Sequence, residues 1–257
     1  MQDYLCSRMA TTIQLCGRLV AELEGERVDR RLPGRQGRVL FAYLVLNRDR
    51  AVSRAELVEA VWPGELPKDP DDALAALLSK VRARLGREYL EGRGELQLLL
   101  PADARVDVEQ ALAAVHEAES ACALGEWARA WGASLCGQLV AKRTLLNEYE
   151  APWIDVWRRT LDEVLMRSLE CYATACLGLG GTELAGAERT ARLLVSSAPL
   201  RESASSLLME ALEKQGNAAE ALLVYEALRQ RLRDELGVAP TERLQTQHRR
   251  LLGASAG

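Results

Sequence analysis

The chain has 257 residues, 48% of them apolar, which is enough for one large domain or two ordinary domains with buried cores. Ala and Leu dominate and Phe occurs once, a balance that favours helices. No run of about 18 apolar residues occurs, which argues against a membrane span. The N-terminal MQDYLCSRMA lacks the apolar stretch of a signal peptide, so we expect a cytoplasmic protein.

The net charge of −4 hides an asymmetry between the two parts of the chain. Residues 1–105 carry a net charge of +1, whereas the remainder carries −5. Within the first part, eight arginines gather between Arg27 and Arg54, and six acidic residues follow between Glu56 and Asp72. A basic cluster is often only a solvated face, and it indicates nucleic-acid binding when a DNA-binding fold surrounds it.

The six cysteines form no CxxC motif and have no histidine at ligand spacing, so the sequence predicts neither a metal nor a cofactor. Cys171 and Cys176 lie five residues apart, which turns them about 140° from each other on a helix. We therefore expect reduced, packed thiols. The cysteines are Cys6, Cys16, Cys122, Cys136, Cys171 and Cys176.

The first elements after an expected disordered segment at residues 1–11 are short strands between Thr12 and Val28. Gly17 and the Glu24-Gly25 pair break the alternation there, which predicts a small sheet. RQGRVLFAYLVLN, residues 35–47, then has apolar residues at helical spacing. Its predicted inward stripe consists of Val39, Leu40, Tyr43, Leu44 and Leu46.

Two further helices follow. SRAELVEAVW predicts a helix that begins with a capping box, in which Ser53 accepts a backbone N–H and Glu56 reaches back to another. A proline-rich loop leads to DPDDALAALLSKVRARLG, residues 69–86, where Asp69 is placed to cap and Pro70 stands in the first turn. This third helix ends at Gly86.

A hairpin closes the first part of the chain. EYLEGRGELQLLL reads as two strands around a turn at residues 92–94. Sheet, three helices and hairpin within about 100 residues describe a winged helix, whose third helix enters the major groove while the hairpin reaches the neighbouring backbone or minor groove.

Beyond Asp103 the sequence predicts helices punctuated by Gly and Pro. Three turn glycines each precede a small residue by five positions, and the last two copies are 35 residues apart, close to the tetratricopeptide period. The pairs are Gly125 with Ala130, Gly181 with Gly186, and Gly216 with Ala221. Small residues at such positions let paired helices approach closely.

The sequence thus predicts a mainly α chain with four parts. Residues 1–11 are a disordered N-terminus, and residues 12–102 form an N-terminal winged helix-turn-helix of α and β structure. Residues 103–253 form an all-α tetratricopeptide-like domain, and residues 254–257 are a tail. Trp127 with Trp131, and Trp153 with Trp157, are i,i+4 pairs that we expect to pack in the helical domain.

A family resemblance rests on both parts together. AAEALLVYEALRQRLRDELGVAPTERLQTQHRRLL resembles the end of the bacterial transcriptional activator domain, in which a helix closes in DELG and a Val-Ala-Pro turn follows. LPGRQGRVLFAYLVLNRDRAVSRAELVEAVWPGELP with ALLSKVRARLG resembles the OmpR-like winged helix of the Streptomyces antibiotic regulatory protein (SARP) family. No GxxxxGK[ST] motif occurs, so the sequence looks like the short form, without the NTPase module of larger relatives.

The resemblance implies a transcriptional activator, expected to act on a secondary-metabolite gene cluster. Such a protein binds direct repeats near promoters in double-stranded DNA and recruits RNA polymerase through its sigma factor or other subunits. Two copies would sit side by side on the repeats, which does not require a dimer in solution. The acidic loop from Glu65 to Asp72 matches the loop that faces the polymerase in OmpR-like proteins.

The predicted DNA contacts fall on three elements. On the third helix, Leu74, Leu78, Val81 and Leu85 mark the inward stripe, which leaves Ser79 and Arg82 for base edges and Lys80 and Arg84 for phosphate. The other phosphate candidates begin the first helix, begin the second helix or lie at the hairpin tip. They are Arg35 and Arg38, Ser53 and Arg54, and Arg93.

Base reading by the third helix is expected to be sparse. Positions that often carry polar or aromatic groups in the family hold Ala75, Ala76 and Leu77. Ala packs against a thymine methyl but gives none of the bidentate hydrogen bonds that distinguish G or A. We therefore expect a preference for thymine methyls, DNA shape and phosphate spacing.

Three alternatives remain open. An enzyme is disfavoured because His116 and His248 stand alone and LGLGG, residues 177–181, follows a helix rather than a strand. A protein-interaction module whose winged helix has lost DNA binding is motivated by the Ala-rich outer face and the acidic net charge. A small-molecule effector in the concave groove of the helical domain is neither supported nor excluded.

Overall fold

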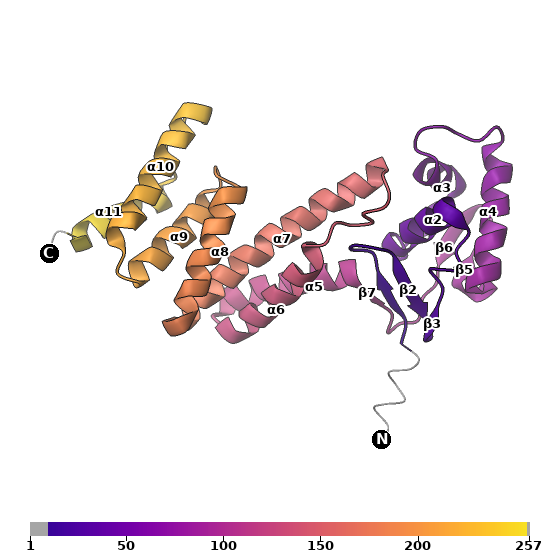
Figure 1. The fold of residues 1–257 in the computed structure, drawn as a ribbon, viewed down its shortest axis with the longest axis horizontal. Helices are drawn as coiled ribbons and strands as arrows, with labels where there is room; N and C mark the ends of the chain where they lie inside the picture. Colours follow the sequence, from indigo (N-terminus) through magenta and orange to yellow (C-terminus); the bar gives the residue numbers. More distant parts are fainter. Residues whose placement is uncertain (1–9, 256–257) are drawn as a thin grey trace, which may run out of the picture. The chain divides into compact units, whose positions relative to one another are not determined.

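The computed structural model describes residues 10–255 (Figure 1) and divides into two compact units. The first comprises the residues up to Gln110 together with Val140–Asp162, and the second comprises Ala111–Leu139 and the residues from Glu163 onward. The predicted mainly helical fold with a small N-terminal β region is confirmed. No helix of the described part is long and apolar enough to cross a membrane.

The first sheet has four strands in the order β3-β2-β1-β7. Strand β1 pairs antiparallel with β2 and parallel with β7, and every second residue faces the core. The strands are β1 (Thr12–Gln14), β2 (Val20–Leu23), β3 (Glu26–Arg27) and β7 (Arg105–Val106). The predicted disorder at residues 1–9 lies outside the described residues, but Thr11 is buried and pairs with Arg105, so the ordered chain begins before residue 12.

The three predicted helices and the hairpin form a winged helix. A second sheet, in the order β4-β6-β5, joins the hairpin to a short strand between the first two helices. The elements of the winged helix are α2 (Gly34–Leu46), β4 (Val52–Ser53), α3 (Arg54–Val61), α4 (Pro70–Leu85), the 3-10 turn η1 (Arg87–Tyr89), β5 (Leu90–Glu91) and β6 (Glu95–Leu98). Gly92 at the hairpin turn has φ of 92°, which only glycine adopts without strain.

Only one of the two hydrogen bonds of the predicted capping box forms at the start of α3. Ser53 Oγ accepts a hydrogen bond from the Glu56 backbone N–H at 3.2 Å, as predicted. The Glu56 carboxylate instead accepts hydrogen bonds from Arg50 and from Tyr43 Oη, the latter at 2.5 Å. These charge-assisted bonds are stronger than a return to the backbone. They hold the pKa of Glu56 below its ordinary value, whereas burial and the bond to Glu56 raise the pKa of Tyr43 to about 12.

The first unit also contains residues well beyond the hairpin, which the sequence did not indicate. Gly17 N–H donates to the Thr144 carbonyl at 2.8 Å and Leu146 N–H donates to the Leu15 carbonyl at 2.9 Å. Leu145 and Leu146 are buried at this contact. The predicted boundary at residue 103 marks where the helical sequence begins. Residues 140–162 of that helical sequence nevertheless pack in the first unit.

Asp107 ties the end of β1 to the start of α5 (Asp107–Leu124). Its carboxylate accepts the backbone N–H groups of Leu15 and Cys16, each at 2.9 Å, and it is 7% exposed. Burial raises its pKa while these N–H bonds oppose the rise. Arg48 adds a two-pronged ion pair to Glu109, with both N–O distances at 2.7 Å.

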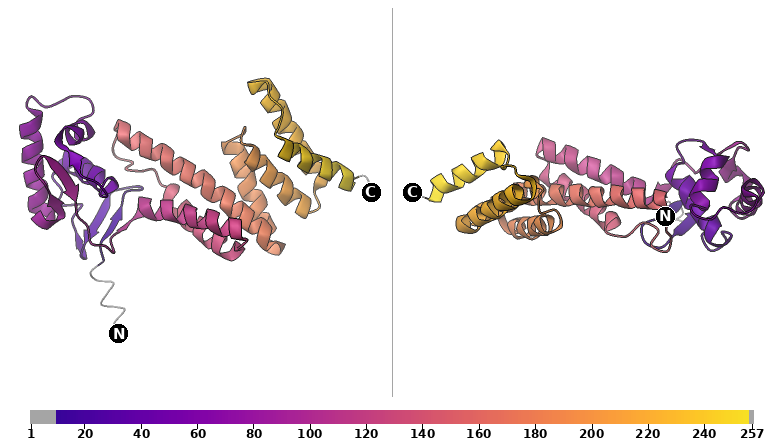
Figure 2. Two further views of the ribbon diagram at one scale, coloured as in Figure 1. Left: turned by 180° about the vertical axis from the view of Figure 1, so that it is seen from behind. Right: turned by 90° about the horizontal axis from the view of Figure 1, so that it is seen from above.

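The remaining helices form the tetratricopeptide-like part. Consecutive helices α8, α9 and α10 lie side by side (Figure 2). The helices after α5 are α6 (Trp127–Ala141), α7 (Pro152–Leu179), α8 (Leu184–Ser197), α9 (Glu202–Lys214), α10 (Ala218–Leu236) and α11 (Glu242–Ser255), with the 3-10 turn η2 (Gly181–Glu183) before α8. Helix α11 thus extends into the predicted tail, of which residues 256–257 lie outside the described residues.

The predicted glycine repeat is confirmed. Gly125, Gly181 and Gly216 all have positive φ, at 71°, 55° and 83°, and each stands between two helices. The small residues five positions later are buried, as close helix packing requires. They are Ala130, Gly186 and Ala221. LGLGG ends α7, since Gly180 and Gly181 both adopt positive φ.

The C-terminal helices match the DELG resemblance. Helix α10 ends at Leu236 and Gly237 takes the left-handed conformation. The Thr241 backbone N–H and hydroxyl then both donate to Glu202 Oε2, at 2.9 and 2.6 Å, which joins the residue before α11 to the start of α9. The core here comprises Ala191, Leu208, Met209, Leu212, Ala221, Tyr225, Leu228, Leu232, Leu244 and Leu251.

The tryptophans divide between the two units, so the expectation that all of them pack in the helical domain is wrong for Trp153 and Trp157. Trp131 stacks in a tilted arrangement on Tyr172, 6.2 Å between ring centroids, within the helical unit. Trp153 belongs to the first unit and contacts Tyr43. The reason is that residues 140–162 pack in the first unit, with the winged helix.

Gly178 on α7 leaves room for the ring of Trp127. A Cβ at this position would lie 2.3 Å from the nearest ring atom. We expect Gly178→Ala to lower the free energy of unfolding by about 1–3 kcal/mol because the indole must shift. Urea unfolding measures this, with Gly132→Ala as control, because nothing lies within 4 Å of a Cβ there. Equal or higher stability for Gly178→Ala would refute the close approach.

Candidate nucleic-acid interface

Helix α4 is amphipathic, with one face in the winged-helix core. Leu74, Leu78, Val81 and Leu85 are buried, as predicted. Leu77 is also buried, so its assignment to the outer, base-reading positions is wrong: its side chain fills the core. The exposed face carries Ala75, Ala76, Ser79, Lys80, Ala83 and Arg84.

The start of α4 is fixed by local capping and by α3. Asp69 accepts the backbone N–H of Asp72 at 3.1 Å, as predicted. Arg54 donates to the Asp71 carbonyl at 3.0 Å and lies 3.7 Å from the Asp71 carboxylate. Arg54 and the capping Ser53 therefore already have protein partners at the helix ends.

Arg82 is placed differently from the prediction. It is half-buried, and its guanidinium donates to the Leu90 carbonyl at 3.2 Å and to the Gly92 carbonyl at 2.7 Å. Both carbonyls belong to the hairpin, which is the wing of the winged helix. Arg82 therefore joins α4 to the wing rather than extending freely toward a base. No local sequence signal indicated this role, because the carbonyls reach Arg82 only in the folded domain.

Arg82 is therefore a positioning residue for the wing. We expect Arg82→Ala to lower the free energy of unfolding by about 1–3 kcal/mol, because two charge-assisted hydrogen bonds are lost. Urea unfolding of the free protein measures this. Arg82→Lys keeps the charge but cannot bridge both carbonyls, so it should recover only part of the loss. Stability unchanged in Arg82→Ala would mean that the hairpin does not depend on this side chain.

Four other candidates surround the same edge. Ser79, Lys80 and Arg84 are exposed on α4, and Arg93 is exposed at the tip of the hairpin that Arg82 holds. Within residues 10–255, the Lys80, Arg84 and Arg93 side chains form no ion pair. Helix α4 and the hairpin thus present exposed cations that have no ion-pair partner in the described part of the chain.

Arg35 and Arg38 belong to a different surface. The Arg35 guanidinium lies 5.8 Å from the centroid of the Tyr149 ring. Arg38 is half-buried and lines a hollow of about 270 Å³ together with Arg27, Arg30 and Tyr149. Six residues separate the end of β3 from the start of α2, and residues of β2 and β3 line the hollow with Arg38. The contacts of the two arginines do not join them to α4 or the hairpin.

The acidic side chains of the loop before α4 and of its first turn are solvent-exposed. Glu65, Asp69, Asp71 and Asp72 all have exposed side chains. Carboxylates at this position would repel phosphate if they faced a duplex. The cationic side chains of the second half of α4 are therefore separated from the acidic side chains of the preceding loop and the first turn.

No metal site or disulfide accompanies these surfaces in the described part of the chain. Within residues 10–255, no group of three His, Cys, Asp or Glu side chains converges as ligands. The described cysteines are all free. They are Cys16, Cys122, Cys136, Cys171 and Cys176, whereas Cys6 lies outside the described residues.

Two regulatory proteins of Streptomyces are similar to most of this chain. Regulatory protein AfsR of Streptomyces griseus is 33% identical over 224 residues, which cover 85% of this chain and 22% of AfsR. Transcriptional regulator RedD of Streptomyces coelicolor is 30% identical over 240 residues, 84% of this chain and 63% of RedD. The chain therefore spans about a fifth of AfsR and under two thirds of RedD.

A solved structure shares the fold, and a family model matches the helical part. Mycobacterium tuberculosis EmbR, solved in complex with a low-affinity phosphopeptide, superposes with a TM-score of 0.83 at 21% identity, over 95% of this chain and 65% of EmbR. Residues 106–252 match the model of the bacterial transcriptional activator domain. The chain belongs to the bacterial transcriptional activator domain family, and its similarity to AfsR and RedD supports the resemblance to regulators of the Streptomyces antibiotic regulatory protein type.

Proposed function

We propose that the chain is a sequence-specific DNA-binding transcriptional activator of a secondary-metabolite gene cluster, acting in the cytoplasm. One observation carries the proposal. The exposed face of α4 offers small residues with Lys80 and Arg84 beside a hairpin that Arg82 holds in place. A helix of this kind fits the major groove, and the hairpin tip with Arg93 then reaches the neighbouring backbone.

The division of labour follows the predicted parts. Residues 12–102 bind double-stranded DNA at promoter direct repeats, and residues 103–253 act as the helical activator domain. The exposed acidic segment from Glu65 to Asp72 recruits RNA polymerase, because its carboxylates would be repelled by the duplex. Two copies occupy adjacent repeats on the DNA.

The Ala75 and Ala76 surface gives this proposal a chemical signature. Both side chains are exposed methyl groups suited to thymine C5-methyls. We expect replacement of contacted thymines by uracil in the operator to weaken binding about 3- to 10-fold, since only a methyl contact is lost. Fluorescence anisotropy measures this, with uracil outside the repeats as control. Unchanged affinity would mean that α4 does not read methyl groups.

The alternative is an interaction module that binds DNA weakly or not at all. The net charge of −4 and the Ala-rich face of α4 favour it. Anisotropy titration with the region upstream of neighbouring genes, at two salt concentrations and against a scrambled duplex, separates the two functions. The activator predicts sequence-selective binding that weakens steeply with salt. Weak binding, equal on both duplexes, would overturn it.

A further inference from the structure

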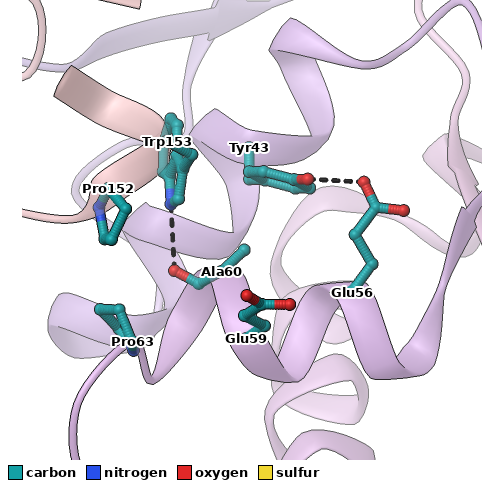
Figure 3. A pocket seen from close by; sticks show the side chains of 7 residues that line it. All are labelled: Tyr43, Glu56, Glu59, Ala60, Pro63, Pro152 and Trp153. Atoms are coloured by element: carbon teal, nitrogen blue, oxygen red, sulfur yellow. Dashed lines mark hydrogen bonds between the residues drawn. The ribbon is translucent and has the colours of Figure 1, made fainter. Parts of the chain in front are cut away.

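The first unit contains a cavity of about 230 Å³ that the DNA-binding function leaves unused (Figure 3). It lies among α2, α3 and the first turn of α7, on residues that are all part of the same unit. This volume is below the range of pockets for drug-sized ligands, so it suits a small molecule. Its lining consists of Tyr43, Glu56, Glu59, Ala60, Pro63, Pro152 and Trp153.

Two aromatic rings form a fixed wall of this cavity. Tyr43 and Trp153 meet edge to face, with 5.1 Å between ring centroids and 79° between ring planes. Trp153 Nε1 donates to the Ala60 carbonyl at 3.1 Å, and Tyr43 Oη donates to Glu56 (Figure 3). Each ring therefore has its polar atom satisfied, and the rings are held in place before any ligand arrives.

The charge of the lining has one sign. The Glu56 carboxylate is neutralised by Arg50, which does not line the cavity. The Glu59 side chain is exposed and forms no hydrogen bond or ion pair within the described residues. No basic side chain lines the cavity. An unpaired carboxylate beside aromatic rings attracts a cation by direct charge and by the ring quadrupoles.

We propose that this cavity binds a small organic cation of the quaternary ammonium or alkylammonium class. Its charged head would lie against Tyr43 and Trp153, with Glu59 as the counter-charge and Pro63 and Pro152 on the apolar side. Aromatic rings recognise quaternary ammonium groups in this way. The lining includes no residue of α4 or the hairpin, so the site can be tested whether or not the chain binds DNA.

Choline and its neutral isostere 3,3-dimethylbutan-1-ol test the site in the full chain. The indole N–H signals are followed by ¹⁵N NMR at constant ionic strength, and Trp153→Phe identifies the Trp153 signal by its loss. Choline should shift this signal, and the neutral isostere should bind at least about fivefold more weakly. Equal shifts with both compounds, or no shift with choline, would overturn the proposal.

Glu59→Gln separates the counter-charge from the shape of the cavity. We expect it to weaken choline binding about threefold or more while leaving the response to the neutral isostere unchanged. Because Glu59 is exposed and unpaired, the variant should fold normally. Glu91→Gln, an exposed carboxylate on the hairpin, is the matched control and should not change choline binding. Equal effects of the two substitutions would show that only the net charge matters, which contradicts a site at Glu59.

Discussion

Replacement of both Lys80 and Arg84 by alanine is expected to weaken DNA binding about 10- to 100-fold at physiological salt, since two charge-assisted phosphate contacts are removed. Both side chains are exposed on α4 and have no ion pair in the described protein that must first be broken. The slope of log affinity against log salt should fall by about two, because each lost phosphate contact releases one counterion fewer. Fluorescence anisotropy over a series of salt concentrations measures both quantities.

A control must show that this loss is local. Arg159→Ala with Arg189→Ala removes the same two charges from exposed, unpaired positions outside the winged-helix elements. We expect this control pair to change affinity less than about threefold, because distant exposed charges are screened. If both pairs weaken binding equally, the long-range field of the protein rather than α4 carries the effect. If neither does, α4 is not at the phosphate backbone.

The largest expected effect on stability comes from Asp107→Ala. The substitution leaves the backbone N–H groups of Leu15 and Cys16 buried without an acceptor. Each such group costs about 1–3 kcal/mol, so the free energy of unfolding of the first unit should fall by about 2–5 kcal/mol. Chemical denaturation followed by circular dichroism measures this loss.

The companion variants make this prediction specific. Asp107→Asn retains one acceptor oxygen and should lose about half as much, since one of the two N–H groups keeps its partner. Asp103→Ala removes an exposed carboxylate of the same segment and should change stability by less than about 0.5 kcal/mol. A loss for Asp107→Ala no larger than that of Asp103→Ala would contradict the account of this contact.

The elements that could be predicted from the sequence are those with local causes. The helical stripe of α4, the Asp69 cap and the hairpin turn each depend on residues within a few positions, and the structure confirms them. The turn glycines at residues 125, 181 and 216 were predictable for the same reason, since left-handed turns favour glycine.

The features that the sequence did not disclose depend on contacts that form only when the elements pack together. The Glu56 side chain leaves the predicted capping box for Arg50 and Tyr43, because the fold brings an arginine within reach. Arg82 meets hairpin carbonyls instead of solvent. The family resemblance also placed Leu77 among the base-facing positions, whereas its side chain is buried in the core.

The cavity at Tyr43 and Trp153 is the clearest case of this limit. These residues are 110 positions apart in the sequence, and the i,i+4 spacing of Trp153 and Trp157 predicted only packing within a helical domain. Arg35 and Arg38 show that neighbours in a basic sequence cluster need not lie on one surface. They share a basic sequence cluster with Arg54, yet Arg35 lies over the Tyr149 ring and Arg38 lines a hollow together with Tyr149.

The most direct measurement of the central claim is a titration of ¹⁵N-labelled protein with an operator duplex, followed amide by amide. Binding through α4 and the wing predicts that the signals of Ala76, Ser79, Ala83 and Arg93 shift or broaden first. Signals on α9 and α10 should stay unchanged in the one-to-one complex. Shifts confined to the helical domain, or to the surface around Arg38 and Tyr149, would contradict the assignment of α4 as the DNA-reading helix.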